Sequence, residues 1–270
     1  MEQATLAGQD DWRGLVSARN DDPRTISVAA FSPSAPMPTF SSPFRVIGSD
    51  HVDYFVKSLD NQQPGLEATL AAELVVAGVG RLIGAPVVRT VVIEIPSALA
   101  GHEPRPGTPI RAGLAHGSAA LERADEMGRP ALYARDQDDN RARHAGVYAL
   151  YDWCYGSDQQ WLYDIDDDRR LYSHDHGLYL PWGWWIDGSA LAAAVDDPHP
   201  LPDPATGLSR TAGEEVAARL EALTRLEVAG VLNQVPAAWP VTDEVLETLG
   251  WFLERRAPGV AARLRSLLVP

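Results

Sequence analysis

A strand–helix–strand pattern in the first half of the chain constrains its fold more than any other feature of the sequence. The apolar run Val52–Val56 has the β-branched and aromatic composition of a strand. Apolar residues at three- and four-residue spacing then predict a helix that begins at Pro64, and Gly84 followed by Pro86 marks its end. A second strand is predicted over Val87–Ile95. This pattern predicts a sheet with one long apolar helix.

Two charged residues stand out in this unit. Lys57 ends the first strand and is the only lysine among 23 basic residues; lysine is a compact point charge on a slim stem, a shape suited to reach a phosphate. Glu73 lies among apolar helix residues, where an acid must face solvent or pair with a buried cation. Strand–Lys–helix–Glu–strand is the layout with which the small lobe of a protein kinase holds nucleotide phosphates. The alternatives are a snorkelling Lys57 and a solvated Glu73.

Composition excludes several classes of partner. The net charge of −14 argues against nucleic acid and anionic membranes. A single cysteine, Cys154, leaves no disulfide framework within the chain and fits a reducing compartment. No apolar run approaches the ~18 residues of a membrane span. We therefore expect a cytoplasmic globular protein that binds neither nucleic acid nor membrane.

The pattern along the chain divides it into three parts. Residues 1–25 are poorly patterned, residues 26–96 are rich in predicted strands, and residues 97–270 are mainly helical. The boundary is placed at Pro96 because the stretch that follows, up to Pro109, is rich in proline, glycine and charge. Strands are predicted at Ile26–Phe31, Phe44–Ile47, Asp53–Val56, Trp161–Ile165 and Arg170–His174, and helices at Ala119–Glu126, Asn140–Tyr155, Gly213–Leu226, Thr242–Arg256 and Val260–Leu268.

Two aspartates follow predicted elements in the second half of the chain. Asp158 comes after a predicted helix, and Asp175 lies in the segment Ser173–Gly177 after a predicted strand. Aspartates on loops at the ends of a hairpin suit phosphoryl transfer, in which one deprotonates the acceptor hydroxyl and the other holds Mg²⁺. A simple turn made by an Asp and a Gly is the alternative.

Two histidines beside Asp175 offer a competing interpretation. His174 and His176 would share one face of a strand and could bind Zn²⁺ or Fe²⁺ together with a carboxylate. No third ligand follows at a recognisable spacing, and a His-Glu-x-x-His helix is absent from the sequence.

A phosphate-binding loop is predicted from a polar segment before the second strand. The segment Thr39–Pro43 contains Ser41 and Ser42, whose hydroxyls and backbone N–H groups would cradle phosphate in place of a glycine-rich loop.

Taken in order, these segments resemble the HipA-like kinases, an atypical branch of the protein-kinase fold. The resemblance rests on Pro38–Pro43, Tyr54–Lys57, Ala71–Leu74, Ile83–Pro86, Ala112–Ser118, Tyr151–Trp153, Gly156–Asp158, Ser173–Gly177, Val235–Trp239 and Leu253–Arg256. It covers nearly the whole chain. It implies an α+β, bilobal protein-kinase-like fold, with a small antiparallel-sheet N-lobe carrying one helix and a mainly helical C-lobe.

The resemblance also implies a function for each candidate residue. Lys57 would contact the α- and β-phosphates of ATP and pair with Glu73. Asp158 would match the catalytic aspartate and Asp175 the metal-binding aspartate. The family's metal-binding Asn, five residues after the catalytic aspartate, is replaced by Tyr163. With a shortened loop, the amide oxygen of Gln160 would take the role of that Asn as a ligand for Mg²⁺.

The leading hypothesis is an ATP- and Mg²⁺-dependent kinase that phosphorylates a Ser or Thr of a protein, with a basic acceptor region favoured by the acidic surface. One alternative is a pseudokinase that holds nucleotide and regulates a partner, and another is a small-molecule phosphotransferase. A Gln160 oxygen near Asp175 favours catalysis, whereas Tyr163 filling that space favours the pseudokinase. A closed, narrow cleft favours the small-molecule enzyme.

Overall fold

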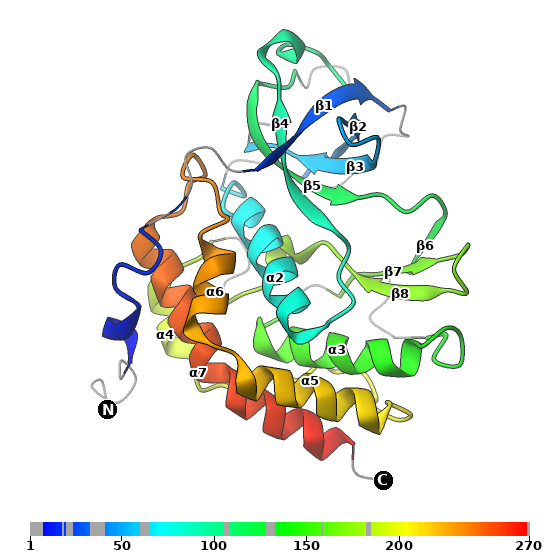
Figure 1. Ribbon diagram of the computed structural model, residues 1–270, viewed down its shortest axis with the longest axis vertical. Coiled ribbons are helices and arrows are strands. Elements are labelled where there is room, and N and C mark those ends of the chain that lie inside the picture. Colours follow the sequence, from blue (N-terminus) through cyan, green and yellow to red (C-terminus); the bar gives the residue numbers. More distant parts are fainter. Residues whose placement is uncertain are drawn as a thin grey trace.

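The structure is a computed structural model that describes residues 8–17, 19, 24–32, 41–59, 65–104, 109–127, 133–157, 159–181 and 185–268. Over these residues the chain is a mixed α+β protein, with a barrel at one end and most of the helices packed together at the other (Figure 1). None of the helices in these ranges is both long enough and apolar enough to cross a membrane.

The barrel is a closed sheet of five strands in the order β1-β2-β3-β5-β4. Its strands are β1 (Thr25–Phe31), β2 (Phe44–Gly48), β3 (Asp53–Lys57), β4 (Thr90–Ile95) and β5 (Gly113–Ala119). Burial alternates along β2 and β3, because successive side chains of a strand point to opposite faces. Val46, Tyr54, Val56 and Ile93 fill the interior of the barrel.

The closure of this sheet corrects the prediction of a purely antiparallel sheet. β1 pairs with β4 in parallel, with Thr25 opposite Val92, whereas the other pairs are antiparallel. The pairing joins the two strands that would otherwise be open edges, and unpaired edges are a liability in a sheet. β5 lies between β3 and β4, so the strand-rich part of the chain continues past residue 96 to Ala119.

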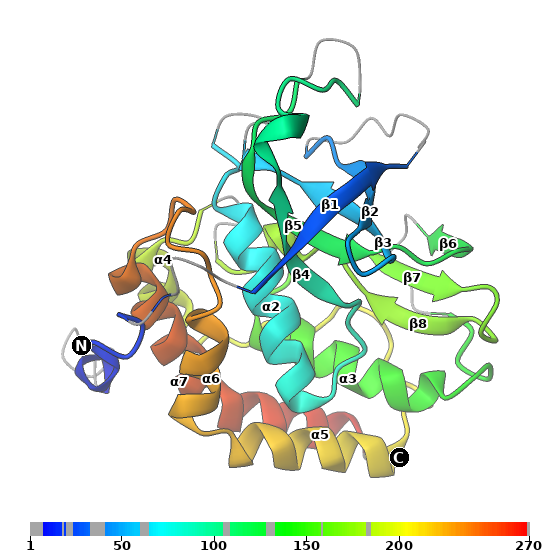
Figure 2. The same cartoon turned by 45° about the horizontal axis from the view of Figure 1, so that its top comes forward.

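Helix α2 (Thr69–Ile83) connects β3 to β4 and lies between the barrel and the other helices (Figures 1 and 2). It ends where the sequence predicts, at Gly84, which adopts a left-handed conformation with φ of 76°. A Cβ on Gly78 would approach Val231 to 2.4 Å, so glycine allows α2 to pack closely against the helix that contains Val231.

The helical end of the molecule also contains a second, three-stranded sheet in the order β6-β7-β8. Its strands are β6 (Ala124–Met127), β7 (Trp161–Asp164) and β8 (Arg170–Ser173), and the helices are α3 (Asn140–Trp153), α4 (Gly188–Ala194), α5 (Arg210–Ala222), α6 (Arg225–Leu232) and α7 (Asp243–Leu267). The described ranges also contain three short 3₁₀ helices, η1 (Gln9–Trp12), η3 (Ser97–Leu99) and η4 (His176–Leu178).

Two predicted helices differ from the observed elements. The segment Ala119–Glu126 is not helical: it includes the end of β5 and most of β6, because pairing with β7 overrides the helix propensity of its Ala, Leu and Glu residues. The two C-terminal helices predicted on either side of Pro258 form the single helix α7. Buried residues keep helical spacing across the proline, from Leu253 and Ala257 to Val260, so packing outweighs the one backbone hydrogen bond that proline removes.

The described part of the N-terminal segment docks on α7. Trp12 is fully buried, and a Cβ on Gly250 would approach its ring to 2.2 Å. The indole N–H donates to Glu254 at 2.6 Å, and Arg19 pairs with Asp243 at 2.5 Å. Because Gly250 has no side chain, the Trp12 ring can pack directly against α7.

Candidate active site

Lys57 lies at the centre of a cluster of three charged side chains. Its Nζ is 2.5 Å from Oε1 of Glu73 and 2.5 Å from Oδ1 of Asp175. The three residues come from the end of β3, from α2 and from the turn between β8 and η4. The structure therefore brings together the lysine, the glutamate and one of the two aspartates singled out in the sequence. We call these three residues the charged cluster.

The exposed fractions of the side chains differ within the charged cluster. The Glu73 side chain is 3% exposed and Lys57 is 12% exposed, whereas Asp175 keeps 33% of its surface in solvent. Lys57 is therefore not a snorkelling strand-end lysine, and Glu73 is not a solvated residue on a helix face. Asp175 therefore has the largest free surface of the three for a ligand, and Lys57 has a smaller one.

Burial and mutual attraction set the charges of the cluster. Burial on its own lowers the pKa of Lys57, but the Glu73 and Asp175 carboxylates outweigh it and hold that pKa above the ordinary lysine value. Burial raises the pKa of Glu73 to about 7, although Lys57 opposes the rise. Burial also acts to raise the pKa of Asp175, but Lys57 dominates and holds it well below its usual range. Lys57 and Asp175 are therefore both charged at neutral pH.

The turn that carries Asp175 is built against α2. Asp175 adopts a left-handed conformation with φ of 53°, which is uncommon for a residue with a side chain. The N–H of His176 donates to Oε2 of Glu73 at 2.9 Å, so the two carboxylate oxygens of Glu73 bind Lys57 and this turn. A Cβ on Gly177 would lie 3.2 Å from Thr69 and 3.3 Å from Glu73, which leaves little room for a side chain. Glu73 thus fixes both Lys57 and the position of Asp175.

Sequence reasoning gave no function to His116, which lies directly opposite Lys57 in the β3–β5 ladder. The imidazole is 1% exposed, and neither ring nitrogen has a hydrogen-bond partner among the residues that the structure describes. Burial lowers the pKa of His116 to about 3, with Lys57 adding to the effect. The His116 imidazole is therefore neutral, and it lies beside Lys57 on the neighbouring strand. Only its place in the ladder, which depends on strand register, could have identified it.

The histidines beside Asp175 point to different partners. Nε2 of His174 lies 3.8 Å from Oε1 of Glu126, and Nε2 of His176 lies 2.8 Å from the hydroxyl of Ser173. Among the residues that the structure describes, no three His, Cys, Asp or Glu side chains gather in a way that could hold a metal ion. The described residues thus give the zinc or iron interpretation no ligand set.

Strand register places the other predicted site residues that the structure describes. Asp158 lies outside the described residues. Gln160 directly precedes β7, and the pair Trp161–Ser173 puts the start of β7 at the same end of the hairpin as Asp175.

Ser41 and Ser42 lie just before β2, and the pair Phe44–Val56 puts the start of β2 beside the end of β3 that carries Lys57. Ser42 has a positive φ of 43°, so the chain turns sharply as it enters the strand. The two serines thus lie at the same edge of the barrel as Lys57.

Tyr163, which stands where the HipA-like kinases that the sequence resembles have a metal-binding Asn, is a core residue. Its side chain is fully buried, and its hydroxyl accepts a hydrogen bond from the N–H of Tyr133 at 3.0 Å. The two tyrosine rings lie 4.1 Å apart. The Tyr163 hydroxyl is thereby bound to the backbone of Tyr133.

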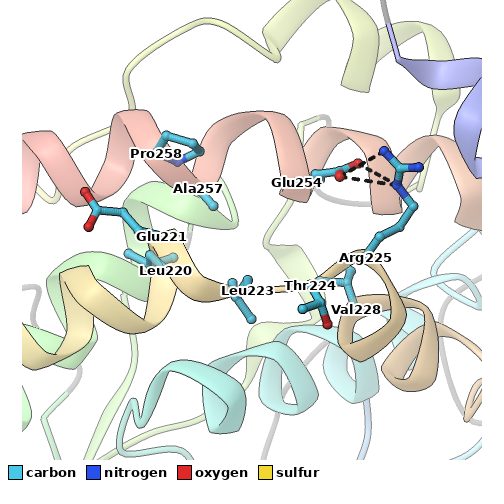
Figure 3. A pocket seen from close by; sticks show the side chains of 9 residues that line it. All are labelled: Leu220, Glu221, Leu223, Thr224, Arg225, Val228, Glu254, Ala257 and Pro258. Carbon is cyan, nitrogen blue, oxygen red and sulfur yellow. Dashed lines mark hydrogen bonds and ion pairs between the residues drawn. The ribbon is translucent and has the colours of Figure 1, made fainter.

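A surface pocket of about 150 Å³ lies between the α5–α6 junction and α7 (Figure 3). Arg225 and Glu254 form an ion pair of 3.0 Å at one end of it. Its lining includes no residue of the charged cluster. Its volume is also well below the roughly 300–1,000 Å³ of small-molecule sites. It is therefore not a nucleotide site.

Comparisons with known proteins define the fold class. No protein-family model matches the sequence, and no curated protein matches it. Among solved structures, the Helicobacter pylori proinflammatory kinase CtkA has a TM-score of 0.59 at 11% identity, over 92% of this chain and 100% of that one. Two structures of the Golgi casein kinase, one with Mn and ADP bound, have TM-scores of 0.48 at 9% identity, over 96% and 95% of this chain and 76% of each of those chains. The likeness to CtkA shows that the chain has a kinase-like fold, and its membership of the HipA-like family stays a prediction.

Proposed function

We propose that this protein is an ATP- and Mg²⁺-dependent HipA-like kinase that transfers the γ-phosphate of ATP to a Ser or Thr hydroxyl of a protein. The kinase-like fold supports a phosphotransferase. The observation that carries the proposal is the position of the only lysine, held 2.5 Å from both Glu73 and Asp175. In a kinase, a lysine paired with a helix glutamate binds phosphates, and an aspartate after the hairpin holds the metal.

The chemistry of the charged cluster fits Mg·ATP. Mg²⁺ prefers carboxylate oxygens, and Asp175 is ionised with a third of its side chain exposed. The buried Glu73 carboxylate holds the Lys57 ammonium in place, so Lys57 would present its charge to the α- and β-phosphates. Bound Mg²⁺ would neutralise charge on the β- and γ-phosphates. Ser41 and Ser42, beside the end of β3, would hold phosphate oxygens.

The acceptor side of the proposed site consists of Asp158 and Gln160. Asp158 would orient and deprotonate the acceptor hydroxyl, and Gln160 would supply a second oxygen to the metal. A protein acceptor with a basic region is favoured by the net charge of −14. We place this activity in the cytoplasm, with a protein substrate or regulatory partner.

One observation favours a nucleotide-binding pseudokinase as the second candidate. The buried hydroxyl of Tyr163 is bound to Tyr133, so Tyr163 gives no second metal ligand at the position where the family has Asn. Catalysis then depends on Gln160 alone for that ligand. A pseudokinase would bind nucleotide and transfer no phosphate.

Transfer of labelled phosphate from Mg·[γ-³²P]ATP to the protein itself or to lysate proteins tests the proposal. We expect Asp158→Asn to bind Mg·ATP like the wild type and to transfer no phosphate, and Gln160→Leu to lose transfer with little change in affinity. Asp196→Asn, which changes an exposed aspartate paired with Arg255, is the matched control and should behave like the wild type. Nucleotide binding without any transfer by the wild type would favour the pseudokinase, and label found only in small molecules would favour the third alternative.

A further inference from the structure

The turn after α3 contains a backbone outlier. Tyr155 adopts a left-handed conformation with φ of 54°, at the position where a helix of this type usually ends in glycine. The N–H of Gly156 donates to the carbonyl of Tyr151 at 2.8 Å, and the N–H of Tyr155 donates to Asp152 at 3.4 Å, which together form a Schellman motif. A left-handed residue with a side chain costs about 1–2 kcal/mol. The tyrosine is therefore held in place by other contacts.

His199 supplies the stacking contact, and the guanidinium of Arg256 also lies over the Tyr155 ring, 5.3 Å from its centroid. Its ring stacks on the ring of Tyr155, with centroids 3.9 Å apart and planes 18° apart. Its Nε2 lies 2.6 Å from the carbonyl oxygen of Gly156. A carbonyl only accepts hydrogen bonds, so Nε2 carries the proton and donates. The His199 imidazole thus contacts both the side chain of Tyr155 and the backbone of Gly156.

His199 is itself fixed. Pro198 and Pro200 flank it, and proline restricts both its own backbone and that of the residue before it. The N–H of His199 donates to Oδ1 of Asp152 at 3.0 Å. Asp152 is buried and pairs with Arg256 of α7 at 3.3 Å. The imidazole is therefore anchored to α3 and α7.

The turn is also tied to the segment that follows Asp175. The hydroxyl of Ser157 donates to the carbonyl of Leu178, and the N–H of Leu180 donates to the carbonyl of Cys154 at 2.9 Å. A Cβ on Gly156 would approach the ring of Tyr151 to 2.4 Å, so the backbone has no space to shift toward α3. Residues 154–157 thus lie between the segment after Asp175 and His199.

We infer that His199 is a positioning residue for phosphoryl transfer, which it serves by holding the backbone of Gly156 two residues before Asp158. This inference rests on the proposed function, because it assigns the fixed turn to the acceptor side of the site. Within the described part of the chain, His199 forms no hydrogen bond with Lys57, Glu73 or Asp175. Its loss should therefore lower the rate of transfer and leave the affinity for Mg·ATP unchanged.

The test compares three variants of the purified full chain. His199→Phe keeps a stacking ring and removes the donor, His199→Gln restores an N–H donor, and His102→Phe is the matched control. His102 is exposed and stacks on Phe31, with centroids 4.0 Å apart, far from this turn in the sequence. Three quantities are measured: the rate of labelled phosphate transfer, the Mg·ATP dissociation constant, and amide hydrogen exchange of the peptide 154–160.

We expect His199→Phe to lower the transfer rate about tenfold to a hundredfold, since small displacements of catalytic groups have effects of this size. The dissociation constant should stay within about twofold, and exchange should rise in peptide 154–160 only. His199→Gln should recover part of the rate, and His102→Phe should match the wild type.

Two results would overturn the inference: unchanged exchange of peptide 154–160 in His199→Phe, or an unchanged transfer rate in that variant. If exchange of peptide 154–160 rises in His199→Phe and the wild type transfers no phosphate, His199 does hold the turn but the proposed kinase activity is wrong. The exchange measurement thus separates failure of the positioning from failure of the proposed function.

Discussion

The two sides of the candidate site are held in different ways. The charged cluster joins Lys57, Glu73 and Asp175 by ion pairs of 2.5 Å, and its members come from a strand, a helix and a turn. The turn at Tyr155 and Gly156 is held by a stacked imidazole, a backbone motif and tight packing. The first side depends on charge, and the second depends on shape. Changes in charge and pH should therefore affect the cluster, and changes in side-chain volume should affect the turn.

The largest effect on stability is expected from Lys57→Met. This change leaves Glu73 and Asp175 together without a counter-charge, and breaking a buried pair costs about 3–5 kcal/mol. The pKa of Glu73, which is already raised to about 7, would rise further, and the pKa of Asp175 would rise above its unfolded value. The loss of stability is therefore greatest above pH 7 and shrinks as the pH falls. Urea unfolding at pH 8 and pH 5 measures this.

The control for that variant is Arg123→Met, which removes the partner of Asp166 in an exposed pair. We expect a loss below about 1 kcal/mol at both pH values. Equal losses in the two variants would contradict the difference between a buried and an exposed pair.

Gly156→Ala should destabilise the turn by about 3 kcal/mol, because its Cβ would lie 2.4 Å from the ring of Tyr151. The loss should be independent of pH between 8 and 5, since no charge changes. Gly230→Ala is the matched control: the space around Gly230 is open and it lies inside α6, so the change should be neutral or stabilising by about 1 kcal/mol. Unfolding free energies of the two variants test the packing at Gly156.

Acid should destabilise the charged side of the site through His116. Its pKa is lowered to about 3 by burial, so the unfolded chain binds a proton more readily and stability falls as the pH drops below about 6.5. Glu73 acts in the opposite direction, because its pKa is raised to about 7 and protonation favours the folded chain. When the pH falls from 7.5 to 5, the free energy of unfolding of His116→Leu should drop by about 2 kcal/mol less than that of the wild type. The free energy of unfolding of Glu73→Gln should drop by more than that of the wild type.

Urea unfolding of the wild type and both variants between pH 7.5 and 5 measures how the free energy of unfolding depends on pH. Identical pH dependence of the wild type and His116→Leu would show that the imidazole is not held neutral behind Lys57.

The smallest change in stability is expected from Tyr155→Gly. Glycine removes a backbone cost of about 1–2 kcal/mol, and the stacked pair that is lost contributes about 0.5–1.5 kcal/mol. These two effects oppose each other, so the unfolding free energy should change by no more than about 1.5 kcal/mol. Exchange of peptide 154–160 should nevertheless rise, and Tyr155→Phe should leave it unchanged. A protected turn in Tyr155→Gly would mean that stacking on His199 does not fix this backbone.

Local patterns predicted the elements around the charged cluster well. The hairpin of β2 and β3 follows from alternation, and α2 follows from its apolar spacing and from Gly84. The parallel pair β1–β4 was missed because it depends on which edges meet in space. The segment Ala119–Glu126 was wrongly predicted as a helix because its residues favour helices until β7 pairs with it.

Sequence signals are strong for the charged cluster and weak for the turn. A single lysine and an acid within an apolar helix mark Lys57 and Glu73, because each residue type is unusual in its setting. His199 contacts a carbonyl 43 residues away, and a histidine between two prolines has no such meaning by itself. Contacts of this kind depend on tertiary packing, so periodicity does not reveal them.

Calorimetric titration of ATP into the wild type and the Lys57 variants, with and without Mg²⁺, tests the central claim most directly. We expect the wild type to bind ATP more tightly with Mg²⁺ than without it. Lys57→Met should weaken Mg·ATP binding at least tenfold, a loss of about 1.4 kcal/mol. Lys57→Arg keeps the charge and should also be impaired, because the guanidinium is too bulky for a point-charge site. Wild-type affinity in both folded variants would contradict the assignment of Lys57 to the nucleotide phosphates.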